Sequence, residues 1–326
     1  MRDTKFGVFL PTGDFEQART AAERAEALGY YSVSLNDHFF APGQQHDAPQ
    51  LECFTTLSAI AALTKRVRIA PAMAAMSFRN PALLAKMAST LDVLSHGRLI
   101  LGVGAGWMRD EYHAHDYPYP TNRQRLAQFA EALKLIKAMW TQETPTYHGP
   151  FFKIEKAYNR PRPVQQPHPP IMIGGGGRKL LEISAVEADI ANFIAPITRG
   201  IFSAEAMVKF DKPRLKEKIA LLNELAAAAG RAPGSIEISG FCSLTVLASQ
   251  PESDAAAAAT AKAMGFPNLE AVKQSPAMLL GTPAELKREI RSRVEEFGMT
   301  YFIMGGAPAA LELFAREVMP EFVQSV

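Results

Sequence analysis

The chain has 326 residues, of which 48% are hydrophobic and 21% charged, and its 35 basic and 33 acidic side chains give a net charge of +2. This composition is typical of a folded globular protein, and the balanced charge argues against nucleic acid or an anionic membrane as partner, so we expect a small-molecule partner. No apolar run approaches the roughly 18 residues that span a bilayer, and no signal-peptide segment follows Met1, which predicts a cytoplasmic protein. Cys53 and Cys242 lie in apolar surroundings and are interpreted as reduced core thiols.

Apolar strand-like runs alternate with amphipathic helical runs, the pattern of a parallel sheet with helices outside it. Strands are expected at 6–10, 32–35, 67–72, 99–103, 171–173, 189–193, within 236–247 and at 301–304. Helices are expected at 16–28, 52–63, 81–95, 123–140, 283–297 and 309–322, with another after the glycines at 174–177. Eight such strands close a (β/α)₈ TIM barrel, so we predict an α/β barrel forming a single domain over residues 1–326. Three longer stretches, at about 107–170, 194–213 and 250–276, are interpreted as insertions.

Four consecutive glycines, Gly174, Gly175, Gly176 and Gly177, separate a short apolar strand from the start of a helix. Glycines expose backbone N–H groups, and a helix N-terminus adds unpaired N–H groups and a positive dipole end. Four glycines forfeit about 2 to 4 kcal/mol of backbone entropy, more than a plain turn requires. The run therefore favours a phosphate-binding loop, with a tightly packed turn as the alternative. Neither Walker nor G-x-G-x-x-G spacing is present, so the ligand is not named.

The active site of such a barrel forms where the strands end. Asp37 and His38 follow the second strand, and a histidine can donate or accept a proton near neutral pH. The alternative is a structural histidine bonded to a backbone carbonyl. The segment 102–107, Gly-Val-Gly-Ala-Gly-Trp, follows the fourth strand and indicates either close approach of a ligand or crowded packing.

A metal site and a hydrolase are both disfavoured. The potential ligands cluster at 110–116, but residues two apart on a helix face in nearly opposite directions, and no second cluster accompanies them. No G-x-S-x-G elbow is present either. We therefore predict no metal.

Several motifs together resemble a known family. They are Asn-Asp-His-Phe at 36–39, Arg-Asn-Pro-Ala-Leu-Leu-Ala at 79–85, Thr-Leu-Asp-Val-Leu-Ser-His-Gly-Arg at 90–98, Leu-Gly-Val-Gly-Ala-Gly-Trp at 101–107, Arg-Pro-Arg-Pro-Val at 160–164 with the glycine run, and Leu-Gly-Thr-Pro-Ala-Glu-Leu at 280–286. The chain resembles the luciferase-like monooxygenase superfamily and, within it, the oxidoreductases that use the deazaflavin coenzyme F420. The resemblance covers nearly the whole chain and is weakest from 194 to 274.

The resemblance implies a bacterial-luciferase-like barrel that holds an isoalloxazine-like ring at its mouth. Asp37 and His38 would lie at the ring or substrate, with His38 transferring a proton. Ala72 and Met73 would occupy the place of the family's non-prolyl cis peptide, which supports the ring. The other residues assigned to the cofactor are Gly104, Gly106, the glycine run Gly174, Gly175, Gly176 and Gly177 at the phosphate, and Thr198 as a helper.

One departure bears on the substrate. F420-dependent glucose-6-phosphate dehydrogenases have a glutamate after the strand-four glycines and a tryptophan shortly after Asp-His; here these places hold Trp107 and, roughly, Pro42. Sugar-phosphate oxidation is therefore disfavoured. Phe39 and Trp107 are expected to contact a hydrophobic or ring-shaped substrate.

These observations predict an F420-dependent oxidoreductase that moves a hydride between the deazaflavin and an organic, hydrophobic substrate. The alternative is an FMN-dependent two-component flavin monooxygenase of the same fold, which would need a separate reductase partner. A third possibility is a non-catalytic flavin-binding protein. The family also implies a homodimer.

Overall fold

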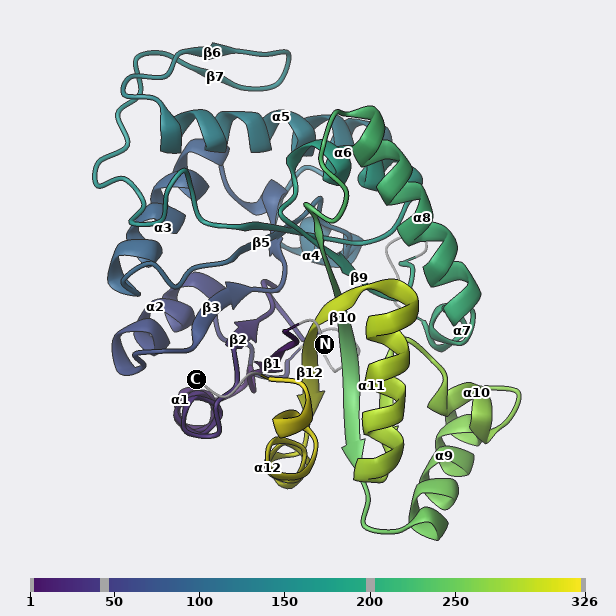
Figure 1. Cartoon of the computed structure of the whole chain (residues 1–326). Helices are drawn as coiled ribbons and strands as arrows, with labels where there is room; N and C mark the ends of the chain where they lie inside the picture. Colours follow the sequence, from purple (N-terminus) through teal and green to yellow (C-terminus); the bar gives the residue numbers. More distant parts are fainter. Residues whose placement is uncertain (1–2, 42–46, 198–202, 324–326) are drawn as a thin grey trace.

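A parallel sheet forms the centre of the molecule. The computed structural model describes residues 3–41, 47–197 and 203–323. The strands follow one another in the spatial order β3-β2-β1-β12-β10-β9-β8-β5-β4, with β11 paired to β10. A parallel bridge between Ile69 of β3 and Leu99, just before β5, brings the first strand of this series beside the segment that leads into β5. The sheet is thereby closed into a barrel, and helices surround it (Figure 1), which confirms the predicted fold.

All eight predicted strands are present. They are β1 Lys5–Phe9, β2 Ser32–Leu35, β3 Arg68–Pro71, β5 Leu101–Gly104, β8 Ile171–Gly174, β9 Ile190–Phe193, β10 Glu237–Val246 and β12 Met299–Gly306. Two further short strands of this sheet were not predicted, β4 Ala74–Ala75 beside β5 and β11 Met278–Gly281 beside β10. Because parallel strands all end on the same side, the segments that follow them meet at one mouth of the barrel.

The barrel helices are α1 Phe15–Ala27, α2 Cys53–Leu63, α3 Pro81–Leu94, α5 Asn122–Thr141, α6 Arg178–Glu187, α8 Lys212–Ala228, α11 Pro283–Phe297 and α12 Pro308–Glu317. Most begin where a side chain caps the first turn, as Asp14 does for α1 and Thr282 for α11. The prediction for the last helix, 309–322, is wrong at its end. Pro320 cannot continue an α-helix, and the 3₁₀ turn η2 Met319–Glu321 replaces it.

The three predicted insertions contain short elements of their own. The first holds α4 Arg109–Ala114 and a hairpin of β6 Tyr147–His148 and β7 Lys153–Ile154, which stands above α5 in Figure 1. The second holds α7 Ala204–Val208, and the third holds α9 Gln250–Met264 and α10 Leu269–Lys273. Lys273 forms ion pairs with Asp254 and Glu285, so α9, α10 and α11 are tied together.

The barrel interior is filled with side chains. Its apolar layer consists of Ala70, Ile100, Met172, Ile190, Tyr301 and Ile303. Two buried polar pairs cross it, Ser32 with Tyr301 at 2.6 Å and Asn192 with Ser239 at 2.9 Å. A ligand site therefore has to form above this layer, at the mouth. The two cysteines are buried and unpaired. In the described part of the chain, no helix is both long and apolar enough to cross a membrane.

Candidate active site

Asp37 joins the end of β2 to the segment that follows β3. Its side chain accepts hydrogen bonds from both terminal nitrogens of Arg79, at 2.6 and 2.9 Å, and from the Ala75 N–H at 2.9 Å. Asp37 is 4% exposed, so this two-pronged pairing compensates a buried charge. Burial alone lowers the pKa of Arg79, but hydrogen bonding and the charges of Asp37 and Glu52 hold that pKa above its ordinary value. Protein groups thus occupy both Asp37 oxygens, which indicates that Asp37 holds the segment of Ala75 and Arg79 in place at the mouth.

The peptide bond between Ala72 and Met73 is cis, at the place that the family resemblance implies. The Met73 side chain lies against glycines of two neighbouring strands. A Cβ on Gly174 would come within 2.6 Å of Met73 Cγ, and a Cβ on Gly104 would lie 3.6 Å from Met73 Cβ. Gly174 therefore makes room for Met73, and Gly104 lies in ordinary contact with it.

Gly106 is explained by the approach of a tyrosine from α4. It has φ +78°, and a Cβ there would lie 1.7 Å from Tyr112 Oη. Tyr112 in turn shares a hydrogen bond with Ser77. Packing, the alternative that the sequence left open, accounts for this glycine.

His38 is paired with a buried glutamate from α4. The His38 Nδ1 lies 2.8 Å from Glu111 Oε2. The other oxygen, Oε1, accepts the backbone N–H groups of Phe39 and Phe40 at 2.5 and 3.3 Å. A carboxylate at Nδ1 favours the tautomer that carries its proton there. Nε2 has no partner among the described residues and is the nitrogen left to exchange a proton.

Trp107 and Phe39, both predicted to contact substrate, take different positions. The Trp107 ring meets the His38 ring edge to face, with centroids 5.4 Å apart. The Phe39 ring instead stacks on His115 with centroids 4.0 Å apart, and it is 41% exposed. The structure brings Trp107 together with His38 and turns Phe39 toward α4.

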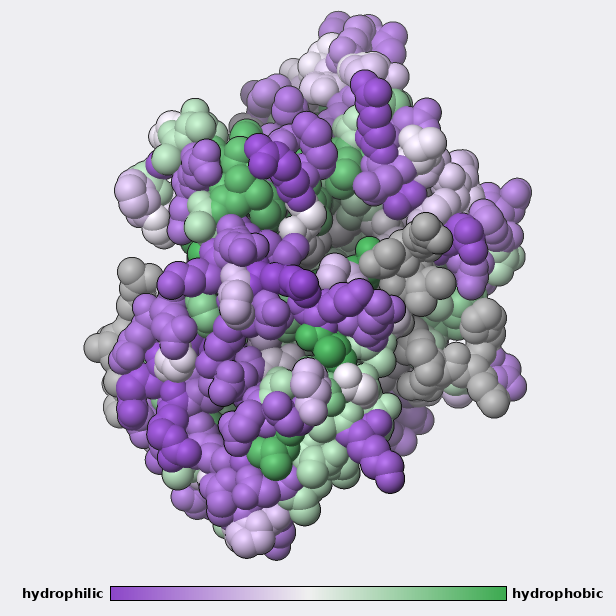
Figure 2. All heavy atoms as spheres, turned by 90° about the vertical axis from the view of Figure 1, so that its right-hand side faces the viewer, coloured by the Kyte–Doolittle hydropathy of each residue, from purple (hydrophilic) through white to green (hydrophobic). Residues whose placement is uncertain are grey.

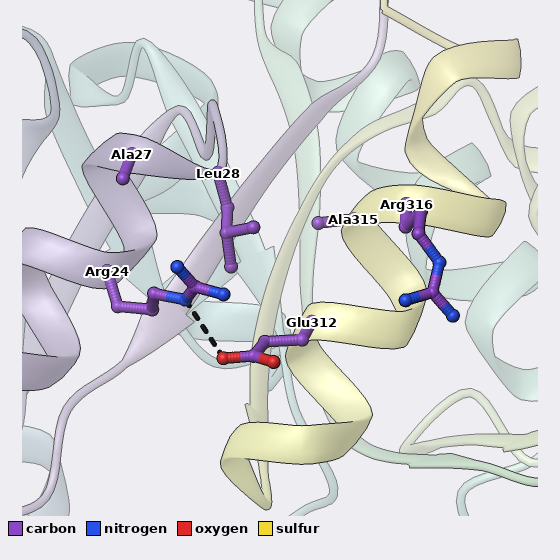
Figure 3. A pocket seen from close by; sticks show the side chains of 6 residues that line it. All are labelled: Arg24, Ala27, Leu28, Glu312, Ala315 and Arg316. Carbon is purple, nitrogen blue, oxygen red and sulfur yellow. Dashed lines mark hydrogen bonds and ion pairs between the residues drawn. The ribbon is translucent and has the colours of Figure 1, made fainter.

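A hollow of about 480 Å³ opens where β1 and β2 end. The described residues that line it are uncharged: Phe9, Leu10, Pro11, Thr12, Gly13, Asn36, Ala41 and Pro49. Asn36 precedes His38 by two residues on the segment that leaves β2. A second hollow, shown in Figure 3, lies between α1 and α12, where Arg24 and Glu312 form an ion pair. Because α1 ends shortly before β2 begins, that hollow is at the opposite end of the barrel.

The glycine run lies after β8 at the same mouth as His38. Gly175 has φ +124°, which an L-residue rarely adopts, and its N–H donates to the Asn192 carbonyl at 2.9 Å. Gly177 differs, because its φ is −74° and a Cβ there would meet nothing within 4 Å. Gly177 also gives α6 no side-chain cap. A tight turn explains Gly175 but not Gly177, where open space faces the first turn of α6.

A lysine from α8 reaches the glycine run. The Lys218 ammonium donates to the Gly176 carbonyl at 2.6 Å, and it would lie 3.0 Å from a Cβ on Gly176. Burial, with a smaller effect of Arg214, lowers the pKa of Lys218. No carboxylate in the described ranges pairs with Lys218. The hydrogen-bond partner found there for this half-buried cation is the Gly176 carbonyl. An anion bound at the glycine run would complement it.

Sequence alone did not indicate the roles of Glu111, Arg79 and Lys218. Glu111 was considered only as a metal ligand, and within residues 3–41, 47–197 and 203–323 no three His, Cys, Asp or Glu side chains gather as a metal site would require. The weak signal for Glu111 was a carboxylate shortly after the strand-four glycines. Thr198 lies outside the described residues.

Comparison with known proteins places this barrel in a family. The family model for luciferase-like monooxygenases matches residues 4–296, so the chain belongs to the luciferase-like monooxygenase family. An uncharacterized protein of Mycobacterium tuberculosis is 33% identical over 244 residues, which are 69% of this chain and 79% of that one.

Two relatives with named activities match about half of each chain. The F420-dependent glucose-6-phosphate dehydrogenase of Amycolatopsis mediterranei is 35% identical over 158 residues, 48% of this chain and 46% of that one. The FMNH(2)-dependent dimethylsulfone monooxygenase of Pseudomonas putida is 30% identical over 176 residues, 54% and 48% of the two chains. A solved F420-dependent secondary alcohol dehydrogenase, in complex with an F420-acetone adduct, superposes with a TM-score of 0.80 over 99% of this chain and 100% of that one. At 22% identity that likeness bears on the fold.

Proposed function

We propose that the protein is an F420-dependent oxidoreductase that transfers a hydride between the deazaflavin and an organic, hydrophobic substrate. The observation that carries the proposal is His38, held at the barrel mouth by buried Glu111, with Nε2 unpaired among the residues that the structure describes. The named relative that uses F420 supports the choice of cofactor. When bound, F420 supplies the ring carbon that gives or takes the hydride.

The residues at the mouth fit such a cofactor. Open space at Gly177, the uncapped first turn of α6 and the Lys218 ammonium together suit a phosphate group. The Ala72–Met73 segment, which Asp37 fixes through Ala75, would lie against the ring. His38 would exchange the substrate's proton at Nε2, while the Glu111 carboxylate orients the imidazole. Thr198 stays a predicted helper at the phosphate.

A hydrophobic substrate is supported by what surrounds His38. Trp107 stands beside it, and the hollow where β1 and β2 end has no charged side chain in its described lining. A sugar phosphate would require a cation at this place to offset the loss of hydration. The substrate class therefore differs from that named for the Amycolatopsis relative.

The second candidate is an FMN-dependent two-component monooxygenase, which the Pseudomonas relative favours. FMN also carries a phosphate, so the glycine run serves both cofactors equally. A reductase partner would be needed only in this case. Oxygen consumption with reduced FMN and candidate substrates would favour the monooxygenase. Binding without turnover, together with an unaltered His38→Ala variant, would instead indicate a non-catalytic flavin-binding protein.

We also propose that the chain forms a single domain and acts as a cytoplasmic homodimer. Leu63 on α2 and Leu83 and Leu94 on α3 are 47%, 53% and 45% exposed, on adjacent helices. The face on the other side of the molecule is mostly hydrophilic, with hydrophobic side chains in separate patches (Figure 2). Light scattering should give a mass of twice the 35.6 kDa of one chain. The double variant Leu83→Glu with Leu94→Glu should give the mass of a single chain.

The experiment that tests the proposed function compares cofactors. Purified protein is titrated with F420 and with FMN, and binding is followed by fluorescence quenching. We expect F420 to bind more tightly and His38→Ala to lower turnover far more than F420 affinity. Tighter binding of FMN would favour the monooxygenase instead.

A further inference from the structure

The side-chain amide of Asn36 is held in one orientation at the hollow where β1 and β2 end. Gln50 Nε2 donates to Asn36 Oδ1 at 2.9 Å and to the Leu51 carbonyl at 3.2 Å. Because a backbone carbonyl only accepts, the Gln50 nitrogen must face Leu51, and the atom of Asn36 that meets it must be the oxygen. The Asn36 Nδ2 group, with two N–H donors, is therefore the end left free.

Those donors have no protein partner in the described part of the chain. Asn36 is half-buried and lines the hollow, two residues before His38. The other polar side chain in the described lining is Thr12, while Phe9, Leu10 and Pro11 supply apolar surface. The hollow thus offers a fixed amide donor, one hydroxyl and an apolar wall, and the donor lies two residues along the chain from the proton-transfer residue.

We propose that Asn36 binds the oxygen of the substrate, and that the hollow takes a neutral molecule with an apolar body and one carbonyl or hydroxyl group. An amide donor satisfies such an oxygen without any charge, and the apolar wall covers the rest of the molecule. A phosphorylated substrate would meet no cation in the described part of the lining to replace its water. The inference rests on the proposed function for the place of the reaction, and it adds the residue and the substrate class.

Binding to the cofactor-free protein tests the inference independently of catalysis. The probes are cyclohexanone, toluene as a ring without oxygen, and glucose 6-phosphate, each titrated by ligand-observed NMR. Asn36→Asp keeps the volume and the oxygen that accepts from Gln50 but removes both donors. Thr12→Val is the matched control in the same hollow. Asn36→Ser is a second variant in case the aspartate lowers folding, which thermal melting reports.

We expect Asn36→Asp and Asn36→Ser to weaken cyclohexanone binding at least fivefold and to leave toluene binding within twofold, with Thr12→Val changing neither by more than twofold. If Asn36 had only a structural role, its replacement would change the affinities for cyclohexanone and toluene by similar factors. Unchanged cyclohexanone affinity in both Asn36 variants, or tighter binding of glucose 6-phosphate than of cyclohexanone to the unmodified protein, would overturn the inference. An F420 titration of the same proteins separates the proposed cofactor from the proposed role of Asn36. If the unmodified protein did not bind F420, only the cofactor assignment would be contradicted.

Discussion

His38 Nδ1 and Glu111 Oε2 lie 2.8 Å apart, although the two residues are separated by 73 positions in the chain. Glu111 is buried, and its second oxygen holds the backbone of the loop that carries His38. The glutamate therefore fixes both the imidazole and the segment to which it belongs. This pair is the part of the mouth whose chemistry the fold defines most completely.

Replacing Glu111 by glutamine should lower turnover by about 10- to 100-fold, because the amide no longer enforces the tautomer that leaves Nε2 to exchange a proton. F420 affinity should change little. Asp110→Asn, on the exposed side of the same helix, is the control and should behave as the unmodified protein. Equal turnover in Glu111→Gln and the control would show that the pair has no part in proton transfer.

Asp37→Asn should act mainly on stability. It removes the charge that pairs with Arg79, and breaking a buried ion pair costs about 3 kcal/mol, somewhat less here because Glu52 still holds Arg79 at 2.7 Å. Urea unfolding would measure the change in the free energy of unfolding. Glu52→Gln, a partner that is 49% exposed, should cost less than about 1 kcal/mol. If Asp37→Asn left stability intact and abolished turnover, Asp37 would be a catalytic residue.

Two glycines in the same run should respond in opposite ways to alanine. Gly177→Ala meets no protein atom, so folding should be unchanged or more stable by about 0.4 to 1 kcal/mol, while cofactor affinity falls because the added methyl fills the phosphate's place. Gly175→Ala should lower stability, because φ +124° strains any L side chain. Thermal melting and F420 titration of both variants would measure this. Undiminished F420 affinity in Gly177→Ala would place the phosphate elsewhere.

Lys218→Gln should weaken F420 binding about tenfold and reduce the dependence of its affinity on salt, because a cation beside the phosphate is lost. Lys216→Gln, exposed on the same helix, is the matched control. Fluorescence titrations at low and high ionic strength would compare the two. If Lys218→Gln and Lys216→Gln bound F420 with the same affinity at each salt concentration, Lys218 would serve only to hold Gly176.

Much of the fold could be predicted because most barrel strands are short runs rich in apolar residues between turn residues, as at 171–174. Periodicity says less about where an element ends, and the prediction for the last helix therefore ran past Pro320, whereas α12 ends at Glu317. The two-residue strand β4 is too short to show any period.

The site was predictable only where neighbouring residues in sequence stay neighbours in space. Asp37 with His38, and the glycine run, could be found in this way. Glu111 and Arg79 meet them only through the closed barrel, over separations of 73 and 42 residues, and nothing local marks them as partners. The glycines at 102–106 had two interpretations. The Tyr112 side chain accounts for Gly106 by packing, whereas Gly104 has only ordinary contact with Met73, so its place at the cofactor stays a prediction.

The most direct test of the central claim is a paired titration and turnover measurement on the unmodified protein and His38→Ala. We expect F420 to bind both proteins with similar affinity and more tightly than FMN. Hydride transfer to cyclohexanone, or from the corresponding alcohol cyclohexanol, should be at least 100-fold slower in the variant. Tighter binding of FMN than of F420, or full turnover in His38→Ala, would contradict the account.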